Sequence, residues 1–334
     1  MEEFHRYQPF PLENGQILED IRIGYHTYGN LNAAADNVVW ICHALTANSD
    51  VVRWWPGMVG EHRYINPEKH FIVCANILGS CYGSSGPLTE NVKTGNNYFS
   101  TFPQITIRDM VKAHRLLCKH LGIQKIKLCL GGSMGGYQVL EWALEDPDLF
   151  DKLFLIATSA AESAWGVAIH TAQRLAIEAD PTWRNDSPDA GAKGLKAARA
   201  IGMLTYRNYK SFVATQRDEE PVLDTYKAET YIHHQGNKLV KRFNAQSYHL
   251  LTRAMDSHHI GRGRGSLESA LETIHIPTLV IGISSDLLCP VEEQRFIAAH
   301  IPGAVFHEID SPYGHDGFLI EGEKITAVLE TFLK

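Results

Sequence analysis

One serine, Ser133, lies among glycines in the stretch IKLCLGGSMGGYQVLEWAL, where an apolar run meets a segment with helical character. Gly131, Ser133 and Gly135 match G-x-S-x-G, the pattern that places a nucleophilic serine on a sharp turn between a strand and a helix. Glycines suit such a turn because bulkier neighbours would clash. The alternative is a glycine-rich phosphate-binding loop, but no Walker lysine follows and the G-x-G-x-x-G spacing is absent. The pattern favours a serine nucleophile.

A serine hydroxyl becomes a good nucleophile only when a histidine takes its proton and a carboxylate orients that histidine. The expected chain order after a G-x-S-x-G serine is acid and then histidine, each on a loop that follows a strand. Asp286 directly follows the apolar run TLVIGISS, and His315 lies shortly after AVFHEID. Taken singly, Asp286 could be a turn or helix-capping residue and His315 only one of 17 histidines. Their order and positions together predict a catalytic triad of Ser133, Asp286 and His315.

The oxyanion formed when such a serine attacks a carbonyl carbon needs two backbone N–H donors. The residue after the nucleophile, Met134, is expected to supply one, and the loop after an early strand supplies the other. The run VVWICH ends in HALTAN, which places Leu45 or a neighbour in that position. These features leave esterase, lipase, peptidase and acyltransferase activities open.

Six short apolar runs are expected to be the strands that position these residues. They are continuous rather than alternating, as strands buried on both faces of a parallel sheet are. They cover residues 38–43, 71–76, 126–132, 153–159, 278–285 and 304–310. Amphipathic segments near 107–121 and 322–334 lie between or after them, so the sequence predicts an α/β sheet with helices on both faces.

Between residues 159 and 266 the strand signal disappears and the sequence has helical character. We therefore expect a core of residues 1–160 and 271–334, interrupted by a helical insertion at 161–270. Open α/β sheets bind ligands at the carboxyl ends of their strands, and the insertion is expected to cover that edge as a lid.

Composition excludes several classes of partner. The 334 residues carry 31 basic and 38 acidic side chains, a net charge of −7, which argues against binding to nucleic acid or to a membrane surface. Neither a signal-peptide pattern nor a membrane-spanning run is visible, so we expect a cytoplasmic protein. Six sparse cysteines, with no C-x-x-C pair, predict neither a disulfide framework nor a metal site.

Beyond the triad, many segments resemble the homoserine O-acyltransferase family, the homoserine O-acetyltransferase type in particular. They lie in order between residues 43 and 319 and include HALTANSD, WWPGMVG, GSCYGSSGP, SAWGVAIHTAQRLAIEADPTW, AARAIGMLTYR, VKRFNAQSYHLLTRAMDSH and YGHDGFL. The resemblance implies an α/β-hydrolase fold with a helical lid and transfer of an acyl group from acyl-CoA, through Ser133, to the side-chain hydroxyl of L-homoserine in methionine biosynthesis. It implies acetyl-CoA as a co-substrate, no bound cofactor, and a homodimer that forms through the lid.

The resemblance also assigns substrate-binding roles. Arg199 and Tyr206 match positions that hold the carboxylate of the amino acid, Asp316 matches the residue that receives its ammonium, and Thr46 lines the pocket. A zwitterion needs this combination of a forked cation and a carboxylate. Without the resemblance, Arg199 would be interpreted as a solvated arginine and Asp316 as a helix cap.

Several points stay open at this stage. The loops HALTANSDV and GSCYGSSGP depart from the commonest family pattern near the pocket, which bears on the choice of acyl group. Homoserine O-succinyltransferase, serine O-acyltransferase and, less favoured, a serine esterase are the alternatives, and an inactive binding protein is disfavoured by the complete triad. Two basic segments, KLVKRF at 238–243 and GRGRG at 261–265, are either CoA-phosphate contacts or solvated surface.

Overall fold

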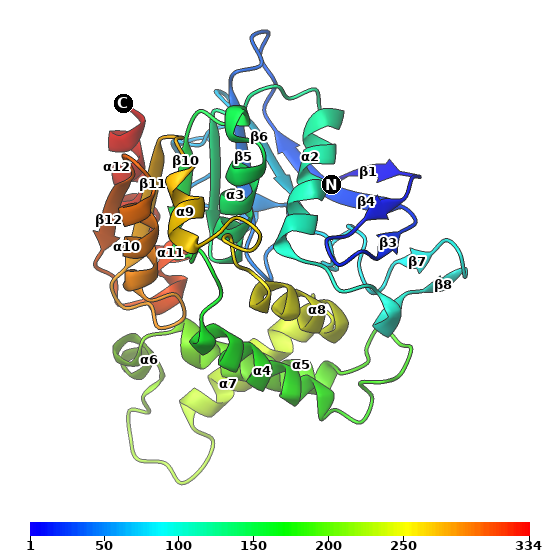
Figure 1. The fold of residues 1–334 in the computed structure, drawn as a ribbon. Helices are drawn as coiled ribbons and strands as arrows, with labels where there is room; N and C mark the ends of the chain where they lie inside the picture. The colour runs from blue at the N-terminus through cyan, green and yellow to red at the C-terminus, as the bar shows by residue number, and fades with distance from the viewer.

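An eight-stranded sheet runs through the computed structural model, which describes residues 1–334 (Figure 1). The strand order is β1-β4-β6-β5-β9-β10-β11-β12. The six strands β6, β5, β9, β10, β11 and β12 run parallel to one another, whereas β4 pairs antiparallel with both β1 and β6. Their bounds are β1 (Glu2–Arg6), β4 (Ile21–Tyr28), β5 (Val38–Cys42), β6 (Phe71–Ala75), β9 (Leu128–Gly132), β10 (Leu153–Ile156), β11 (Thr278–Ile283) and β12 (Val305–Ile309).

The parallel strands have continuous apolar sequences because most of them are covered on both faces. In β5, Val38 and Trp40 face one hydrophobic cluster, whereas Val39 and Ile41 face another on the opposite side of the sheet. All five residues of β5 are buried. All six strands predicted from the sequence are present, and each is shorter than its apolar run.

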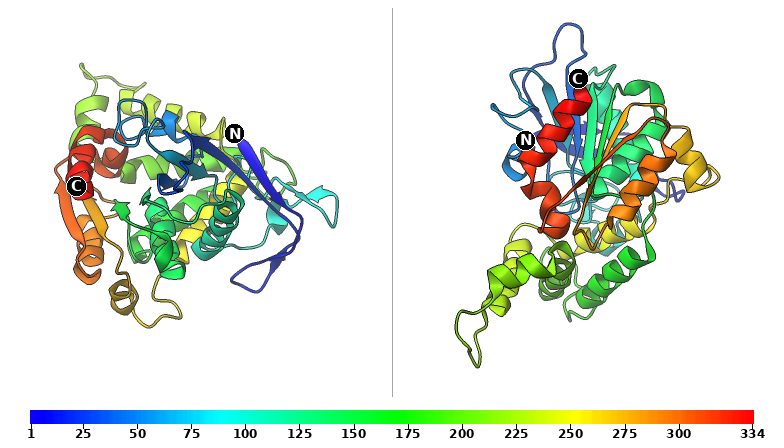
Figure 2. Two further views of the ribbon diagram at one scale, coloured as in Figure 1. Left: turned by 90° about the horizontal axis from the view of Figure 1, so that it is seen from above. Right: turned by 90° about the vertical axis from the view of Figure 1, so that its left-hand side faces the viewer.

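Helices cover both faces of this sheet, as the right-hand view in Figure 2 shows. One layer holds α2 (Ile107–His120), α3 (Met134–Glu145), α9 (Leu267–Glu272) and α10 (Val291–His300). The other holds α1 (Val51–Trp54), α11 (Gly317–Ile320) and α12 (Gly322–Leu333). Helix α2 begins at a capping box in which Thr106 and Asp109 satisfy each other's backbone N–H groups. This arrangement of three layers, with helices on both faces of a mostly parallel sheet, is the α/β architecture predicted from the sequence.

The antiparallel edge of the sheet had no clear signal in the sequence. Strand β4 has the sequence IRIGYHTY, which mixes polar and apolar residues because the strand lies nearer the edge. Two short hairpins, β2 (Phe10–Pro11) with β3 (Ile17–Leu18) and β7 (Glu90–Asn91) with β8 (Asn96–Asn97), lie on the same side of the molecule (Figure 1).

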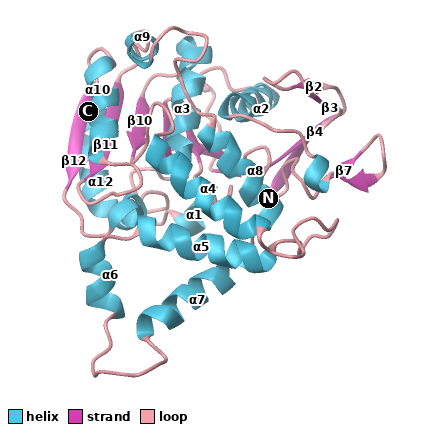
Figure 3. Cartoon of the chain, turned by 60° about the horizontal axis from the view of Figure 1, so that its bottom comes forward, coloured by secondary structure: helices cyan, strands magenta, loops and turns pink.

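Five helices at one end of the sheet form a cap that we call the lid, residues 164–256 (Figures 1 and 3). They are α4 (Ala164–Glu178), α5 (Ala192–Tyr206), α6 (Tyr209–Gln216), α7 (Lys227–Val240) and α8 (Ala245–Asp256). The sequence segment 194–214, expected to be helical, is broken at Arg207 and Asn208, whose side chain caps α6. Helix α7 lies within the insertion that was expected to be helical, although no separate helix was predicted at its position. No helix in the molecule has the length and apolarity needed to cross a bilayer.

Candidate active site

Ser133 occupies a strained turn between β9 and α3. Its backbone has φ 55° and ψ −130°, a conformation that side-chain-bearing residues rarely adopt. The flanking glycines make the turn possible: a Cβ on Gly135 would lie 2.1 Å from the carbonyl oxygen of Cys42, and one on Gly131 would lie 2.3 Å from the carbonyl carbon of Gly135. The glycines therefore let α3 start directly against β5 and β9, with Ser133 at the tip.

His315 and Asp286 come together from the loops after β12 and β11. The ring Nδ1 of His315 lies 2.7 Å from Oδ2 of Asp286. The other carboxylate oxygen accepts hydrogen bonds from the backbone N–H groups of Leu288 and Cys289, at 2.8 and 2.9 Å. Asp286 is therefore held at both oxygens and fixes the orientation of the imidazole, with Nδ1 as the donor and Nε2 left for chemistry.

The electrostatic surroundings of His315 favour its charged form. Burial alone would lower the pKa of the imidazole, but the charge and hydrogen bond of Asp286, with smaller contributions from Asp316 and Glu162, outweigh it and raise the pKa. A base with a raised pKa accepts a proton from a hydroxyl more readily, provided that the pH is high enough to keep it neutral.

Ser133 and His315 line one cavity of about 360 Å³ between the sheet edge and the lid. The same cavity is lined by all the side chains predicted to bind substrate, namely Thr46, Arg199, Tyr206 and Asp316, and by Leu45. Asp286 lies behind His315, outside the lining, as an orienting acid should. The Ser133 hydroxyl makes no hydrogen bond within the protein. The hydrogen bond between a catalytic serine and its histidine often tightens only once substrate is bound.

Two backbone N–H groups are available to an oxyanion. Met134 is the first residue of α3, and its N–H, at a helix N-terminus, has no acceptor within the protein. The N–H of Leu45, in the loop after β5, has no acceptor either. Leu45 lines the cavity beside Ser133. Both predicted oxyanion donors are thus free to bind a ligand.

Two side chains of opposite charge, Arg199 from the lid and Asp316 from the loop after β12, line the same cavity. Arg199, on α5, makes no hydrogen bond or ion pair, and its guanidinium carbon lies 5.3 Å from the centre of the Tyr206 ring. Burial raises the pKa of Asp316, against opposing effects of His315, Arg199 and Arg207. The Arg207 guanidinium lies 3.7 Å from the Asp316 carboxylate. An unpaired guanidinium and a partly buried carboxylate in one cavity match the two ends of an amino-acid zwitterion.

Several lining residues had no role in the sequence analysis. His170, on α4, and Met255, on α8, reach the cavity only because the lid folds over the sheet. Of the two basic segments, KLVKRF contributes Lys238 and Arg242 to the lining, and Arg242 donates to the carbonyl of Thr46.

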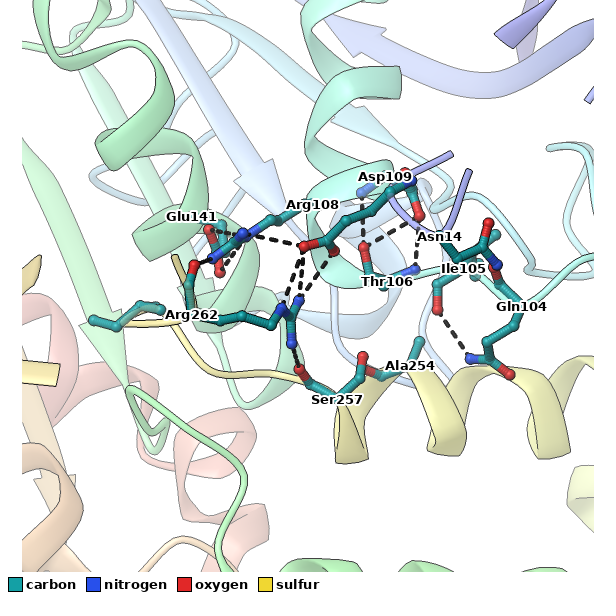
Figure 4. A network of polar contacts seen from close by, with 12 residues as sticks. Asn14, Gln104, Ile105, Thr106, Arg108, Asp109, Glu141, Ala254, Ser257 and Arg262 are labelled. Atoms are coloured by element: carbon teal, nitrogen blue, oxygen red, sulfur yellow. Dashed lines mark hydrogen bonds and ion pairs between the residues drawn. The ribbon is translucent and has the colours of Figure 1, made fainter. Parts of the chain in front are cut away.

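The arginines of the other basic segment, GRGRG, lie elsewhere. Arg264 pairs with Glu141 and Glu145, each at 2.7 Å. Arg262 pairs with Glu13 at 3.0 Å and donates to the carbonyl of Ser257 (Figure 4). Neither arginine lines the cavity, because they tie the loop after α8 to helix α3 and to the β2–β3 hairpin.

Comparison with known proteins identifies the family of this chain. Residues 37–321 match the α/β hydrolase fold family. A homoserine O-acetyltransferase of Cyclobacterium marinum is 45% identical over 331 residues, which are 99% of this chain and 94% of that protein. The chain belongs to the homoserine O-acetyltransferase family. The resemblance drawn from the sequence motifs is thereby confirmed.

Solved structures show how widely the fold of this family is shared. The homoserine O-acetyltransferase of Bacillus anthracis superposes with a TM-score of 0.92 at 24% identity, covering 100% of this chain and 97% of that one. An acetylester hydrolase of Corynebacterium glutamicum superposes with a TM-score of 0.87, also at 24% identity, covering 99% and 95%. At such identities the likeness concerns the fold, which a transferase and a hydrolase have in common.

Proposed function

We propose that this protein transfers an acetyl group from acetyl-CoA to the side-chain hydroxyl of L-homoserine, as a step of methionine biosynthesis. One observation carries the proposal: a single cavity holds Ser133, His315 and the opposed charges of Arg199 and Asp316. The serine and histidine suit acyl transfer, and the opposed charges suit a free amino acid as acceptor.

In the first half-reaction, Nε2 of His315 takes the hydroxyl proton of Ser133 while Oγ attacks the thioester carbon. The N–H groups of Met134 and Leu45 stabilise the resulting oxyanion. The carbon–sulfur bond then breaks, and CoA leaves as the thiol after receiving the proton from His315. Asp286 stays ionised and stabilises the imidazolium throughout. The product is an acetyl ester on Ser133.

In the second half-reaction, Arg199 and Tyr206 hold the carboxylate of homoserine and Asp316 holds its ammonium. Asp316 directly follows His315 in the chain, so binding of the ammonium places the homoserine hydroxyl near the base. His315 accepts the hydroxyl proton, the alkoxide oxygen attacks the acetyl carbon, and Ser133 recovers its proton as O-acetylhomoserine forms. The lid limits access of water, which would otherwise hydrolyse the ester.

Steady-state kinetics with two donors and two acceptors test this proposal. We expect turnover with acetyl-CoA and L-homoserine, parallel initial-rate lines, and an added mass of one acetyl group on Ser133 when acetyl-CoA is supplied alone. Ser133→Ala is expected to abolish both adduct and turnover. Intersecting lines without an adduct would refute the covalent route, and faster turnover with L-serine would refute the acceptor.

Two other reactions are separated by the same assays. Hydrolysis of a small ester needs no site for a zwitterion. Unchanged turnover in an Arg199→Ala variant would therefore favour an esterase, an activity that the acetylester hydrolase of the same fold represents. For succinyl transfer, the cations Lys238 and Arg242 in the cavity lining would suit the distal carboxylate of the acyl group. Arg242 is already hydrogen-bonded to Thr46 and Tyr82, however, and this supports the smaller acetyl donor over the succinyl donor.

We also propose that two copies associate through their lids, in the cytoplasm, where acetyl-CoA is available. More than half of the large apolar side chains that are exposed belong to this part of the chain: Trp165, Leu175, Leu204, Tyr209, Val213, Val222, Leu223 and Tyr226. Exposed apolar side chains concentrated on one part of a monomer mark an interaction surface.

A further inference from the structure

A second histidine faces the cavity from the lid. His170, on α4, is 3% exposed and lines the cavity together with Ser133 and Arg199. Its ring Nδ1 lies 2.8 Å from Oδ1 of Asp256, at the end of α8. The cavity is therefore lined by two histidines that are each held through Nδ1 by an aspartate, and the mechanism above uses only His315.

The ring of His170 is fixed by its neighbours. Asp256 is itself held by Arg174, one turn further along α4, with a separation of 2.6 Å between Nη2 and Oδ2. Because Asp256 accepts from Nδ1, the other ring nitrogen, Nε2, is left for the cavity. No group of the protein is hydrogen-bonded to that Nε2. A rigidly held ring nitrogen in a binding cavity is a feature of specific recognition.

His170 lines the cavity from the lid, as Arg199 and Tyr206 do. Its chain neighbour Ile169 packs in a small cluster with Leu288 and Cys289, against which Tyr206 also packs. Helices α4 and α5, which carry His170 and Arg199, run side by side in the lid (Figures 1 and 3). His170 thus lies on the same side of the cavity as the residues proposed to bind the carboxylate.

Acidic and basic groups both lie around His170. Glu162, in the loop after β10, and Asp256 are the acids near its ring. Both are engaged, Glu162 by the hydroxyl of Tyr137 at 3.0 Å and Asp256 by Arg174. The groups that face it from the rest of the cavity are Arg199, Tyr206, His315 and Asp316.

A carboxylate has more acceptor sites than the fork of one arginine can fill. We propose that His170 is a further binding residue for the amino-acid acceptor, and that it binds as the imidazolium, with Nδ1–H donated to Asp256 and Nε2–H donated to the acceptor carboxylate beside Arg199. Asp256 and Arg174 act on the substrate only through the orientation they give the ring. This inference rests on the proposed function, since it presumes an amino acid as acceptor.

Binding measurements test the inference without turnover. In a Ser133→Ala background, isothermal titration calorimetry with L-homoserine is expected to show affinity weaker by about tenfold for His170→Leu, the loss typical of one hydrogen bond to a charged group. His249→Leu is the matched control. His249 also joins α8 to α4 through a carboxylate, Glu178 at 2.8 Å, yet does not line the cavity. The control is expected to bind homoserine as the background does.

Kinetics of the active enzyme separate binding from a structural role. With Ser133 intact, His170→Leu is expected to raise KM for homoserine about tenfold, with little change in kcat or in the rate of acetylation of Ser133 by acetyl-CoA alone. If the leucine variant does not fold, His170→Asn replaces it, because an amide can still donate to Asp256 without reaching the cavity. The same rise in KM is then expected.

The outcomes distinguish this inference from the proposed function. An enzyme that acetylates homoserine with unchanged KM and affinity after loss of His170 would overturn the inference alone. Equal loss of both half-reactions would also overturn it, because that indicates a structural role. A wild-type protein that binds no homoserine would overturn the inference and the proposed acceptor together.

Discussion

At the scale of single residues, the site works because three carboxylates have different partners. Asp286 is saturated with hydrogen bonds and orients His315. Asp316 faces the cavity beside Arg207, and Glu162 is bound by Tyr137. Both raise the pKa of His315 from outside the triad. The proposed binding of the substrate ammonium is therefore coupled to the strength of the base through Asp316.

The coupling predicts a pH effect for Asp316→Asn. The base must be neutral, so acylation falls as the pH drops through the raised pKa of His315. Removal of the Asp316 charge lowers that pKa, and we expect the acid limb of Ser133 acetylation by acetyl-CoA to move to lower pH by about half a unit. KM for homoserine should rise as well, because the ammonium loses its counter-ion. The control Glu323→Gln, on the exposed side of α12, should leave the pH profile of Ser133 acetylation unchanged. An acid limb that does not move in Asp316→Asn would contradict the coupling.

Much of this site was predictable from the sequence, for a physical reason. Ser133, Asp286 and His315 each follow a strand whose apolar run is plain, and parallel strands bring such loops to one edge. Arg199 and Asp316 needed the family resemblance, since neither carries a local signal. His170 could not be predicted, because its place in the cavity depends on how α4 docks over the sheet.

At the scale of elements, burial decides which strands and helices could be predicted from the sequence. Strands buried on both faces have continuous apolar sequences, so β5 and β11 were recognised. Strand β4 was missed because it has a partly exposed surface and a mixed sequence, and the bounds of α7 within the predicted helical insertion were not predicted for the same reason. Their positions depend on tertiary packing rather than on local pattern.

The junction of β9 with α3 predicts a stability effect for Gly135→Ala. The added Cβ would lie 2.1 Å from the Cys42 carbonyl oxygen, so β5 and α3 must separate. We expect the free energy of unfolding to fall by about 3 kcal/mol, measured by urea denaturation. Gly122→Ala is the control: its Cβ would meet nothing within 4 Å, and only the left-handed φ of +68° opposes it, at about 1–2 kcal/mol. Equal losses in the two variants would show that the close approach is relieved without cost.

At the scale of the whole molecule, the lid has two surfaces with different tasks. Its inner side supplies His170, Arg199, Tyr206 and Lys238 to the cavity. Its outer side carries the exposed apolar residues, and Figure 2 shows the loop between α6 and α7 projecting away from the sheet. A lid that must exclude water from an acyl-serine benefits from being held in place from outside, which association with a second copy would do.

This arrangement predicts that acidic substitutions on the outer lid separate a dimer. Leu223 is fully exposed and Tyr209 is 77% exposed, so glutamate at both positions places charge on the proposed contact without disturbing the core. We expect light scattering after gel filtration to give twice the chain mass for the wild type and the single-chain mass for Tyr209→Glu with Leu223→Glu. The matched control is Ile17→Glu with Val92→Glu, at exposed apolar positions outside the lid, which should stay dimeric.

A lid without its partner copy should also admit more water to the acyl-serine. The ratio of acetyl-CoA hydrolysis to acetyl transfer should therefore rise in the lid variant alone. A wild type with the mass of a single chain would refute the dimer. A lid variant that remains dimeric would show that the contact lies elsewhere.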